Sequence, residues 1–274
     1  MAVSEQRQAI LDKISELEKQ GLFDHDVEND PPFKPIAKDE VDFTIKKISS
    51  KIKSSVCEKI TFNAIKSNIK QGNIIIEKVE GIENLTSLKS GAIITANHFN
   101  PFDSVPLHLT IKKYKHQHLY KVIKEGNYSF EGFYGYILKN FYTLPIPSDF
   151  NVLKDFLNGV DTLLNKGNLI LVYPEQAMWW NYKKPRPLKD GAFRFAIKSN
   201  VPILPTFVTM SNSDKLDSDG CYIQKYTLHI SKPIYPDKDL SLKENIEHMK
   251  NENYQIWKDI YEKTYQKELK YEEE

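Results

Sequence analysis

The stretch Gly91-Ala-Ile-Ile-Thr-Ala-Asn-His-Phe-Asn-Pro-Phe-Asp103 contains the residues that decide both fold and chemistry in this 274-residue chain. Residues 91–96 are small or apolar and favour β-structure, so they predict a short buried strand. The stretch becomes polar at His98, and Asn100-Pro101 breaks any regular element that would continue the strand. The sequence therefore predicts that His98 and Asp103 lie at a turn from a strand into a helix.

Similar apolar runs occur on both sides of this stretch. They are residues 73–80, 118–124, 167–174, 201–208 and 226–234. Helix-like stretches, such as 151–166 and 188–199, separate them. Strands that alternate with helices indicate an α/β fold. We expect a mixed, largely parallel sheet flanked by helices.

The chain divides into three predicted regions. Residues 1–71 form an N-terminal helical region with a Pro-rich linker at Pro31, Pro32 and Pro35, and its first helix spans about residues 4–20. Residues 72–240 form the α/β core. Residues 241–274 form a long C-terminal helix and an acidic tail, and the helix is predicted from five apolar residues on one side: Ile246, Met249, Trp257, Ile260 and Tyr261.

A lysine-rich amphipathic helix is predicted over residues 39–71. Its apolar positions recur three or four apart, at Val41, Ile45, Ile48, Ile52, Val56 and Ile60, and seven lysines occupy other positions in 43–70. One interpretation packs the apolar side on the core and leaves the lysines in solvent. The other places the helix at an anionic membrane surface, with 1–20 as a second contact. Both can hold at different ends of the helix.

The overall composition excludes several classes of protein. Lys and Arg number 38 against 37 Asp and Glu, and a net charge of +1 argues against a dedicated nucleic-acid binder. The sequence has no run of 18 consecutive apolar residues, which is the length that a bilayer-spanning helix needs. The charged N-terminus lacks the apolar core of a secretory signal. We expect a cytoplasmic protein, peripheral on the inner face of the membrane. Cys57 and Cys221 have no metal-ligand spacing, so we expect reduced thiols and neither a metal nor another cofactor.

His98 and Asp103 have the residue types and order of a general base and its partner. A carboxylate that binds the Nδ1 proton of a histidine leaves Nε2 free to act as a base. No serine nucleophile is needed if the substrate supplies the hydroxyl. A histidine followed by an aspartate at this spacing is by itself also consistent with a structural pair.

Four short blocks occur in one order within about residues 75–235. The first is Asn-His-x-x-x-x-Asp at 97–103, followed by Tyr-Pro-Glu-Gln at 173–176, Leu-Lys-Asp-Gly-Ala-Phe at 188–193 and Val-Pro-Ile-Leu-Pro at 201–205. Together they resemble the lysophospholipid acyltransferase family. Its PlsC-type members make phosphatidic acid from 1-acyl-glycerol-3-phosphate. In the family's own order, Tyr-Pro-Glu-Gln at 173–176 corresponds to the third block, which usually reads Phe-Pro-Glu-Gly.

The chain departs from the family at two blocks. Ser148 stands where the second block usually has an arginine for the acceptor phosphate, and Gln176-Ala177-Met178 replaces Gly-Thr-Arg. The basic residues that follow offer a relocated site for a phosphate or for an acidic carrier, or else a plain exposed basic loop; they are Lys183, Lys184, Arg186 and Lys189. Of the adjacent Trp179 and Trp180, we expect one packed and one exposed.

The resemblance implies an O-acyltransferase that moves a fatty acyl group from acyl-CoA or acyl carrier protein to a lysophospholipid hydroxyl. His98 would be the base and Asp103 its partner. Asn97, Glu175 and Lys189 would bind the acceptor, and Asn97 would also fix the turn. Main-chain N–H groups at the start of the helix after His98 would bind the oxyanion. Two alternatives stay open: a hydrolase with the same pair, and a non-catalytic membrane-surface protein. The acceptor headgroup, acyl donor, chain length and oligomeric state are not determined by the sequence.

Overall fold

Seven strands form one sheet in the computed structural model, which describes residues 3–28 and 32–272. The sheet order is β1-β7-β6-β2-β5-β3-β4, and β6 and β7 are its antiparallel neighbours. All other neighbouring strands are parallel. In chain order the strands are β1 (Ile75–Glu80), β2 (Ala92–Thr95), β3 (Leu119–Lys124), β4 (Thr143–Ile146), β5 (Leu169–Val172), β6 (Ile203–Leu216) and β7 (Tyr222–Ile230). The predicted mixed, largely parallel sheet is confirmed.

A strand overlaps each of the six apolar runs, although β6 continues eight residues past its run and β7 begins four residues before its own. Strand β4 was not expected. It is four residues long and includes Pro145, which cannot donate a main-chain hydrogen bond and therefore suits the edge of a sheet. The central strands β2 and β5 are buried at every position, because helices cover both faces.

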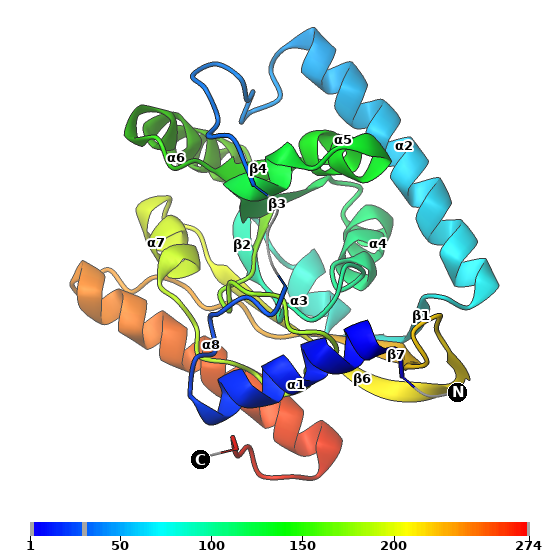
Figure 1. Cartoon of the computed structure of the whole chain (residues 1–274). Coiled ribbons are helices and arrows are strands. Elements are labelled where there is room, and N and C mark those ends of the chain that lie inside the picture. Colours follow the sequence, from blue (N-terminus) through cyan, green and yellow to red (C-terminus); the bar gives the residue numbers. More distant parts are fainter. Residues whose placement is uncertain (1–2, 29–31, 273–274) are drawn as a thin grey trace.

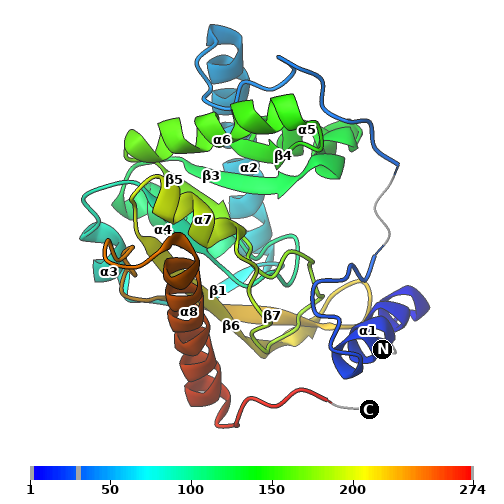
Figure 2. The ribbon, with the colours of Figure 1, turned by 90° about the vertical axis from the view of Figure 1, so that its left-hand side faces the viewer.

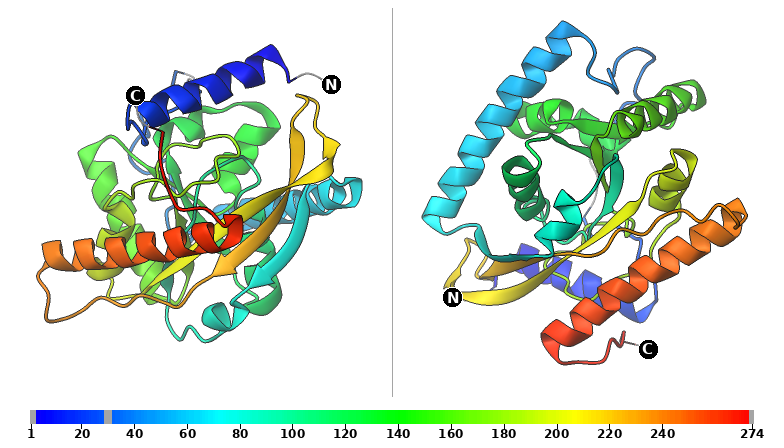
Figure 3. Two further views of the ribbon diagram at one scale, coloured as in Figure 1. Left: turned by 90° about the horizontal axis from the view of Figure 1, so that it is seen from below. Right: turned by 180° about the vertical axis from the view of Figure 1, so that it is seen from behind.

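Helices lie on both faces of the sheet (Figure 1). One face packs against α6 (Phe150–Asn165), α7 (Gly191–Lys198) and α8 (Leu242–Tyr265). The other packs against α3 (Ile82–Thr86) and α4 (Val105–Tyr114). A short 3-10 helix η1 (Glu125–Ser129) and α5 (Gly132–Asn140) connect β3 to β4. The front view in Figure 1 and the back view in Figure 3 both place α2 and α8 on opposite sides of the molecule.

The C-terminal helix α8 begins where the sequence predicts it. Ser241 caps α8 by accepting from the Glu244 amide, while the Glu244 side chain accepts from the Ser241 amide. Met249 and Trp257 are fully buried against the sheet face. The end of the acidic tail, Glu273-Glu274, and Pro31 of the linker lie outside the described residues.

Helix α1 (Glu5–Lys19) packs on the loop that follows β5 (Figure 2). Ser4 caps it, because the Ser4 hydroxyl accepts a hydrogen bond from the Arg7 amide at 3.2 Å. Its apolar residues Ile10, Ile14 and Leu17 are buried against Ala177 and Trp179. The apolar side of α1 is therefore used inside the protein, which removes the reason to expect a membrane contact through it.

Helix α2 (Ile48–Gln71) differs from its prediction in two ways. It begins nine residues later than expected, because residues 39–47 form a loop in which Phe43 packs against Gly159 of α6; a Cβ on Gly159 would lie 2.6 Å from the Phe43 Cβ. The helix also leaves its apolar stripe in solvent: Ile48 is 76% exposed and Ile52 60%. The interpretation that the apolar side packs on the core is therefore wrong for Ile48, Ile52, Val56 and Ile60, whereas Val41 and Ile45 do pack on it.

Candidate active site

His98 and Asp103 meet at the carboxyl end of β2, in the turn before α4. Nδ1 of His98 lies 2.5 Å from Oδ2 of Asp103, and the Phe99 amide donates to the same oxygen at 3.2 Å. The contact predicted from their spacing is present. Asp103 is buried, whereas His98 is partly exposed, and no described residue forms a hydrogen bond with its Nε2. The imidazole thus has one nitrogen held by the protein and one available to a substrate.

Tyr173 is a third member of this cluster that the sequence analysis did not single out. It directly follows β5, the strand beside β2, and its hydroxyl donates to Oδ1 of Asp103 at 2.5 Å. Its ring lies flat on the His98 imidazole, with centroids 3.9 Å apart and planes 14° apart. Burial, together with the Asp103 charge, raises the pKa of Tyr173 well above its ordinary value, so the hydroxyl stays protonated.

Glu175 and Arg186 form a buried ion pair behind the His98 turn. Nη2 of Arg186 lies 2.9 Å from Oε2 of Glu175, and the Arg186 amide donates to Oε1 at 2.8 Å. Oε2 also accepts from the His98 amide at 3.0 Å. The guanidinium further donates to three main-chain carbonyls, of His98, Ala177 and Phe23. The pair therefore ties the turn after β2 to the loop after β5.

This geometry differs from the expected contact of Glu175 and Arg186 with substrate. Glu175 is 2% exposed and Arg186 1%, and the polar atoms of both side chains are used inside the protein. Asn97 is also buried, and its amide exchanges hydrogen bonds with the main chain of Val208. That contact agrees with the expectation that Asn97 fixes the turn.

The predicted cluster of cations after the tryptophans is not an open site. Lys184 pairs with Glu18 at 2.5 Å, and Lys189 pairs with Asp24 at 2.6 Å. Lys183 lies over the Tyr265 ring, 5.6 Å from its centroid. The acidic partners lie on α1 and in the segment after it, far from these lysines in the sequence. In this structure the three lysines thus have acidic or aromatic partners within the chain, and Lys189 remains exposed.

The adjacent tryptophans differ in burial, much as expected. Trp179 is fully buried, and its Nε1 donates to the carbonyl of His25 at 2.9 Å. Trp180 is partly exposed and carries the Arg7 guanidinium over its ring, 3.5 Å from the centroid. Both indoles hold α1 and its loop in place.

Ser148 lies just beyond β4 and is exposed. Its amide donates to Oε2 of the buried Glu125 at 3.1 Å, while Oε1 of Glu125 accepts from the Ile36 amide at 2.7 Å. This carboxylate fixes the main chain at the place where the family carries its arginine. The side chain there brings no positive charge for a phosphate.

Four main-chain N–H groups of the turn between β2 and α4 are used internally. The amides of His98 and Phe99 donate to Glu175 and Asp103. Those of Phe102 and Asp103 donate to Asn100. These four amides therefore offer no free N–H group to an oxyanion.

Lys121 is a charged residue within a strand, close enough to Asp103 for their charges to interact. Burial lowers the pKa of Lys121, while the Asp103 charge opposes this shift. Its neighbour His108, on α4, is 5% exposed and stacks on Phe141. Burial lowers the pKa of His108 to about 3, so its imidazole is neutral at ordinary pH.

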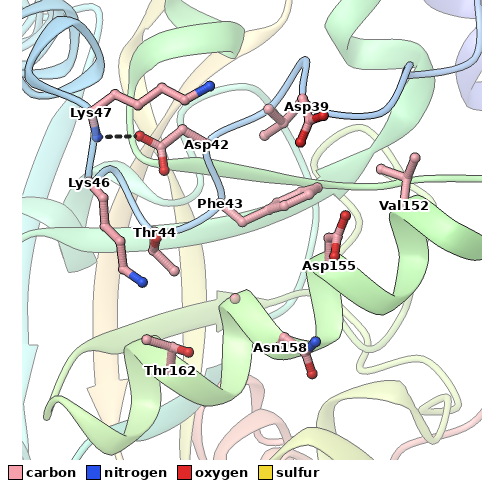
Figure 4. Close-up of a pocket in the computed structure, with 12 residues that line it drawn as sticks. Asp39, Asp42, Phe43, Thr44, Lys46, Lys47, Val152, Asp155, Asn158 and Thr162 are labelled. Carbon is pink, nitrogen blue, oxygen red and sulfur yellow. Dashed lines mark hydrogen bonds between the residues drawn. The ribbon is translucent and has the colours of Figure 1, made fainter.

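A separate pocket of about 320 Å³ lies between the loop at 39–47 and α6 (Figure 4). Polar side chains line it, including Asp42, Lys46 and Asp155. Neither His98 nor Asp103 lines this pocket. It therefore does not belong to the cluster described above.

Comparison with known proteins finds a family model that covers the residues of this cluster. The Acyltransferase family model matches residues 77–209, which include His98, Asp103, Tyr173 and Glu175. The chain is also similar to the crystal structure of the 1-acyl-sn-glycerophosphate (LPA) acyltransferase PlsC from Thermotoga maritima, with a TM-score of 0.48 and 19% identity over 78% of this chain and 85% of that chain. The curated proteins contain no match. Residues 77–209 thus form an Acyltransferase domain, and the protein is an acyltransferase.

Proposed function

We propose that this acyltransferase moves a fatty acyl group from an acyl thioester to the free hydroxyl of a lysophospholipid. The single observation that carries the proposal is the contact of His98 Nδ1 with Asp103 Oδ2 at 2.5 Å, which leaves Nε2 for a hydroxyl. The order of the four sequence blocks supports a glycerolipid acceptor, with 1-acyl-sn-glycerol-3-phosphate as the expected one. Acyl-CoA or acyl carrier protein is the expected donor.

The proposed reaction is a direct transfer without an acyl-enzyme. The acceptor oxygen attacks the thioester carbonyl as His98 Nε2 removes the hydroxyl proton, and Asp103 stabilises the imidazolium that forms. The tetrahedral intermediate then expels the thiolate, which takes the proton back from Nε2. The products are an ester and a free thiol, and the reaction needs no metal or other cofactor.

Glu175 and Arg186 have a positioning role in this scheme. They hold the His98 main chain from behind through the amide and the carbonyl of that residue. A displacement of about 1 Å in a catalytic group can lower a rate by about 100-fold, so a buried ion pair at this place serves catalysis without touching substrate.

The membrane contact proposed for the enzyme uses the exposed stripe of α2. Ile48, Ile52 and Val56 lie one turn apart on the helix and are all exposed. Lysines of the same region, including Lys46, Lys47, Lys51 and Lys53, would add attraction to anionic headgroups. No helix within the described residues is long and apolar enough to cross a membrane.

The function is tested by supplying labelled acyl-CoA and labelled acyl carrier protein with a panel of lysolipids and separating the products by thin-layer chromatography. A labelled diacyl product that depends on added lysolipid supports the proposal. Thioester cleavage at the same rate without a lysolipid identifies a hydrolase instead, and no consumption with any acceptor favours a binding protein.

The role of His98 is tested with His98→Ala on the acceptor that works best. We expect kcat to fall by about 10²–10⁴-fold, the usual contribution of a positioned base. A purified variant that keeps its circular dichroism spectrum and more than half of the activity would contradict the role given to His98.

A further inference from the structure

Tyr173 is placed to control the electrostatics of the His98–Asp103 pair. Its hydroxyl reaches Oδ1 of Asp103 while His98 Nδ1 occupies Oδ2, so each carboxylate oxygen has a different partner. Its ring covers one side of the imidazole at 3.9 Å. The same side chain thus contacts both members of the pair.

The two contacts limit the motion of the pair in different directions. The hydroxyl prevents the carboxylate from rotating, because both oxygens would lose a partner if it turned. The stacked ring prevents the imidazole from tilting out of the plane in which Nδ1 meets Asp103. Residues from two adjacent strands, β2 and β5, therefore fix one imidazole orientation.

We propose that Tyr173 is a positioning residue that completes a Tyr173–Asp103–His98 chain and tunes the basicity of His98 through Asp103. The proposal rests on the proposed function for its kinetic consequence.

The direction of the effect follows from the charge on Asp103. A hydroxyl that donates to Oδ1 draws negative charge away from the oxygen that faces the imidazole. Without that donor, Oδ2 carries more negative charge and stabilises the imidazolium better. Loss of the hydroxyl should therefore raise the pH at which the His98 ring titrates.

Other charged groups face this pair from neighbouring elements. Asp103 interacts electrostatically with Lys121 on β3, Tyr134 on α5 and Tyr226 on β7. Glu175 and Arg186 contact the His98 main chain, and His108 faces Lys121 from α4. All of them remain in a variant that changes Tyr173 alone, so their contributions are common to both proteins.

Tyr173→Phe is the informative variant because it removes the hydroxyl and keeps the stacked ring. Phenylalanine is also the residue of the family block that this segment resembles, so the fold should tolerate it. Tyr226→Phe is the matched control: its hydroxyl lies in the same region but accepts from Asn100 at 2.9 Å and has no hydrogen bond to Asp103.

The first measurement is an NMR titration of the His98 ring, assigned by its absence in His98→Ala. We expect the midpoint in Tyr173→Phe to rise by about half a pH unit, with no change in Tyr226→Phe. This measurement needs no substrate, so it tests the proposal even if the proposed function fails. An unchanged or lowered midpoint in Tyr173→Phe overturns the proposal.

The second measurement is the pH dependence of kcat/KM with the acceptor found above. We expect Tyr173→Phe to lose about 10-fold at its optimum, and the limb that rises with pH to move upward by the same half unit. If kcat/KM falls but the rising limb of its pH profile does not move, the hydroxyl only supports packing, and the tuning role is overturned. Full activity in His98→Ala would instead contradict the catalytic role of His98, whereas the proposed function fails if no lysolipid yields a diacyl product.

Discussion

Oε2 of Glu175 accepts a hydrogen bond from the main-chain N–H of His98 at 3.0 Å, although the two residues are 77 positions apart. The bond joins the turn after β2 to the loop after β5, which are neighbouring parallel strands. The carboxyl ends of neighbouring parallel strands meet at one edge of a sheet, and sites in α/β folds are commonly built there. Here that edge places a buried ion pair directly behind the proposed base.

Loss of the Glu175 charge should destabilise the protein more than it affects acceptor binding. In Glu175→Gln the buried Arg186 guanidinium keeps its charge without a counter-ion, so we expect the free energy of unfolding to fall by about 3–5 kcal/mol. Glu77→Gln is the control, because Glu77 pairs with Lys225 at the surface and should lose at most about 1 kcal/mol. Urea unfolding measures both. A Glu175→Gln protein of normal stability with a raised acceptor KM would restore the direct acceptor contact.

Asp103→Asn should keep the fold and lose turnover. The amide cannot stabilise an imidazolium and can force His98 into the wrong tautomer, so we expect kcat to fall by about 10²–10⁴-fold. Thermal unfolding and the rate assay are run on one sample. Loss of folding with no separate effect on turnover would indicate that the pair has only a structural role.

His108 should make the protein less stable in mild acid. Its pKa is about 3 in the folded protein and about 6.5 when unfolded, so between these values the unfolded state binds the proton. Its favourable contribution is complete above pH 6.5 and decreases as the pH falls toward 3. Between pH 7 and pH 5 the loss should be about 2 kcal/mol.

This prediction is checked by urea unfolding of the wild type and His108→Leu at both pH values. The variant cannot take up that proton, so its stability should decrease by about 2 kcal/mol less than that of the wild type. Comparison with the wild type cancels the contributions of the other histidines. Equal decreases in the two proteins would show that His108 does not titrate as its burial indicates.

The exposed stripe of α2 should determine binding to vesicles. Replacing Ile48, Ile52 and Val56 by Ser removes apolar burial at the interface, so co-sedimentation with anionic vesicles should fall strongly. Leu242→Ser is the control, since Leu242 is exposed on α8 at the other side of the molecule. Turnover on a soluble short-chain acceptor should stay unchanged. Wild-type binding by the triple variant would disprove the contact through α2.

The lysines near the stripe should contribute a salt-dependent part of the same binding. Each lysine near an anionic surface contributes about 1 kcal/mol, and physiological salt screens the field within about 8 Å. Replacing Lys46, Lys47, Lys51 and Lys53 by Gln should therefore weaken binding at low salt more than at high salt. The measurement is co-sedimentation across a salt series with anionic and with phosphatidylcholine vesicles. An effect that does not depend on salt would contradict an electrostatic role.

Local sequence pattern was sufficient for much of the fold and for the closest contact of the site. The apolar runs predicted six of the seven strands, because burial on both faces demands continuous apolar residues. Only β4 was missed, a four-residue edge strand whose Pro145 weakens the signal. His98 and Asp103 were paired correctly because five residues within one turn suffice to join them.

Contacts between distant segments were decided by the tertiary structure alone. The sequence marks Glu175, Arg186 and Lys184 as charged, but their burial and partners depend on how α1 and the loop after β5 dock. The pattern of α2 marks an apolar side without saying whether protein covers it, since periodicity describes one helix and not its neighbours. Tyr173 reads as an ordinary aromatic at a strand end, and it becomes part of the site only because parallel pairing sets β5 beside β2.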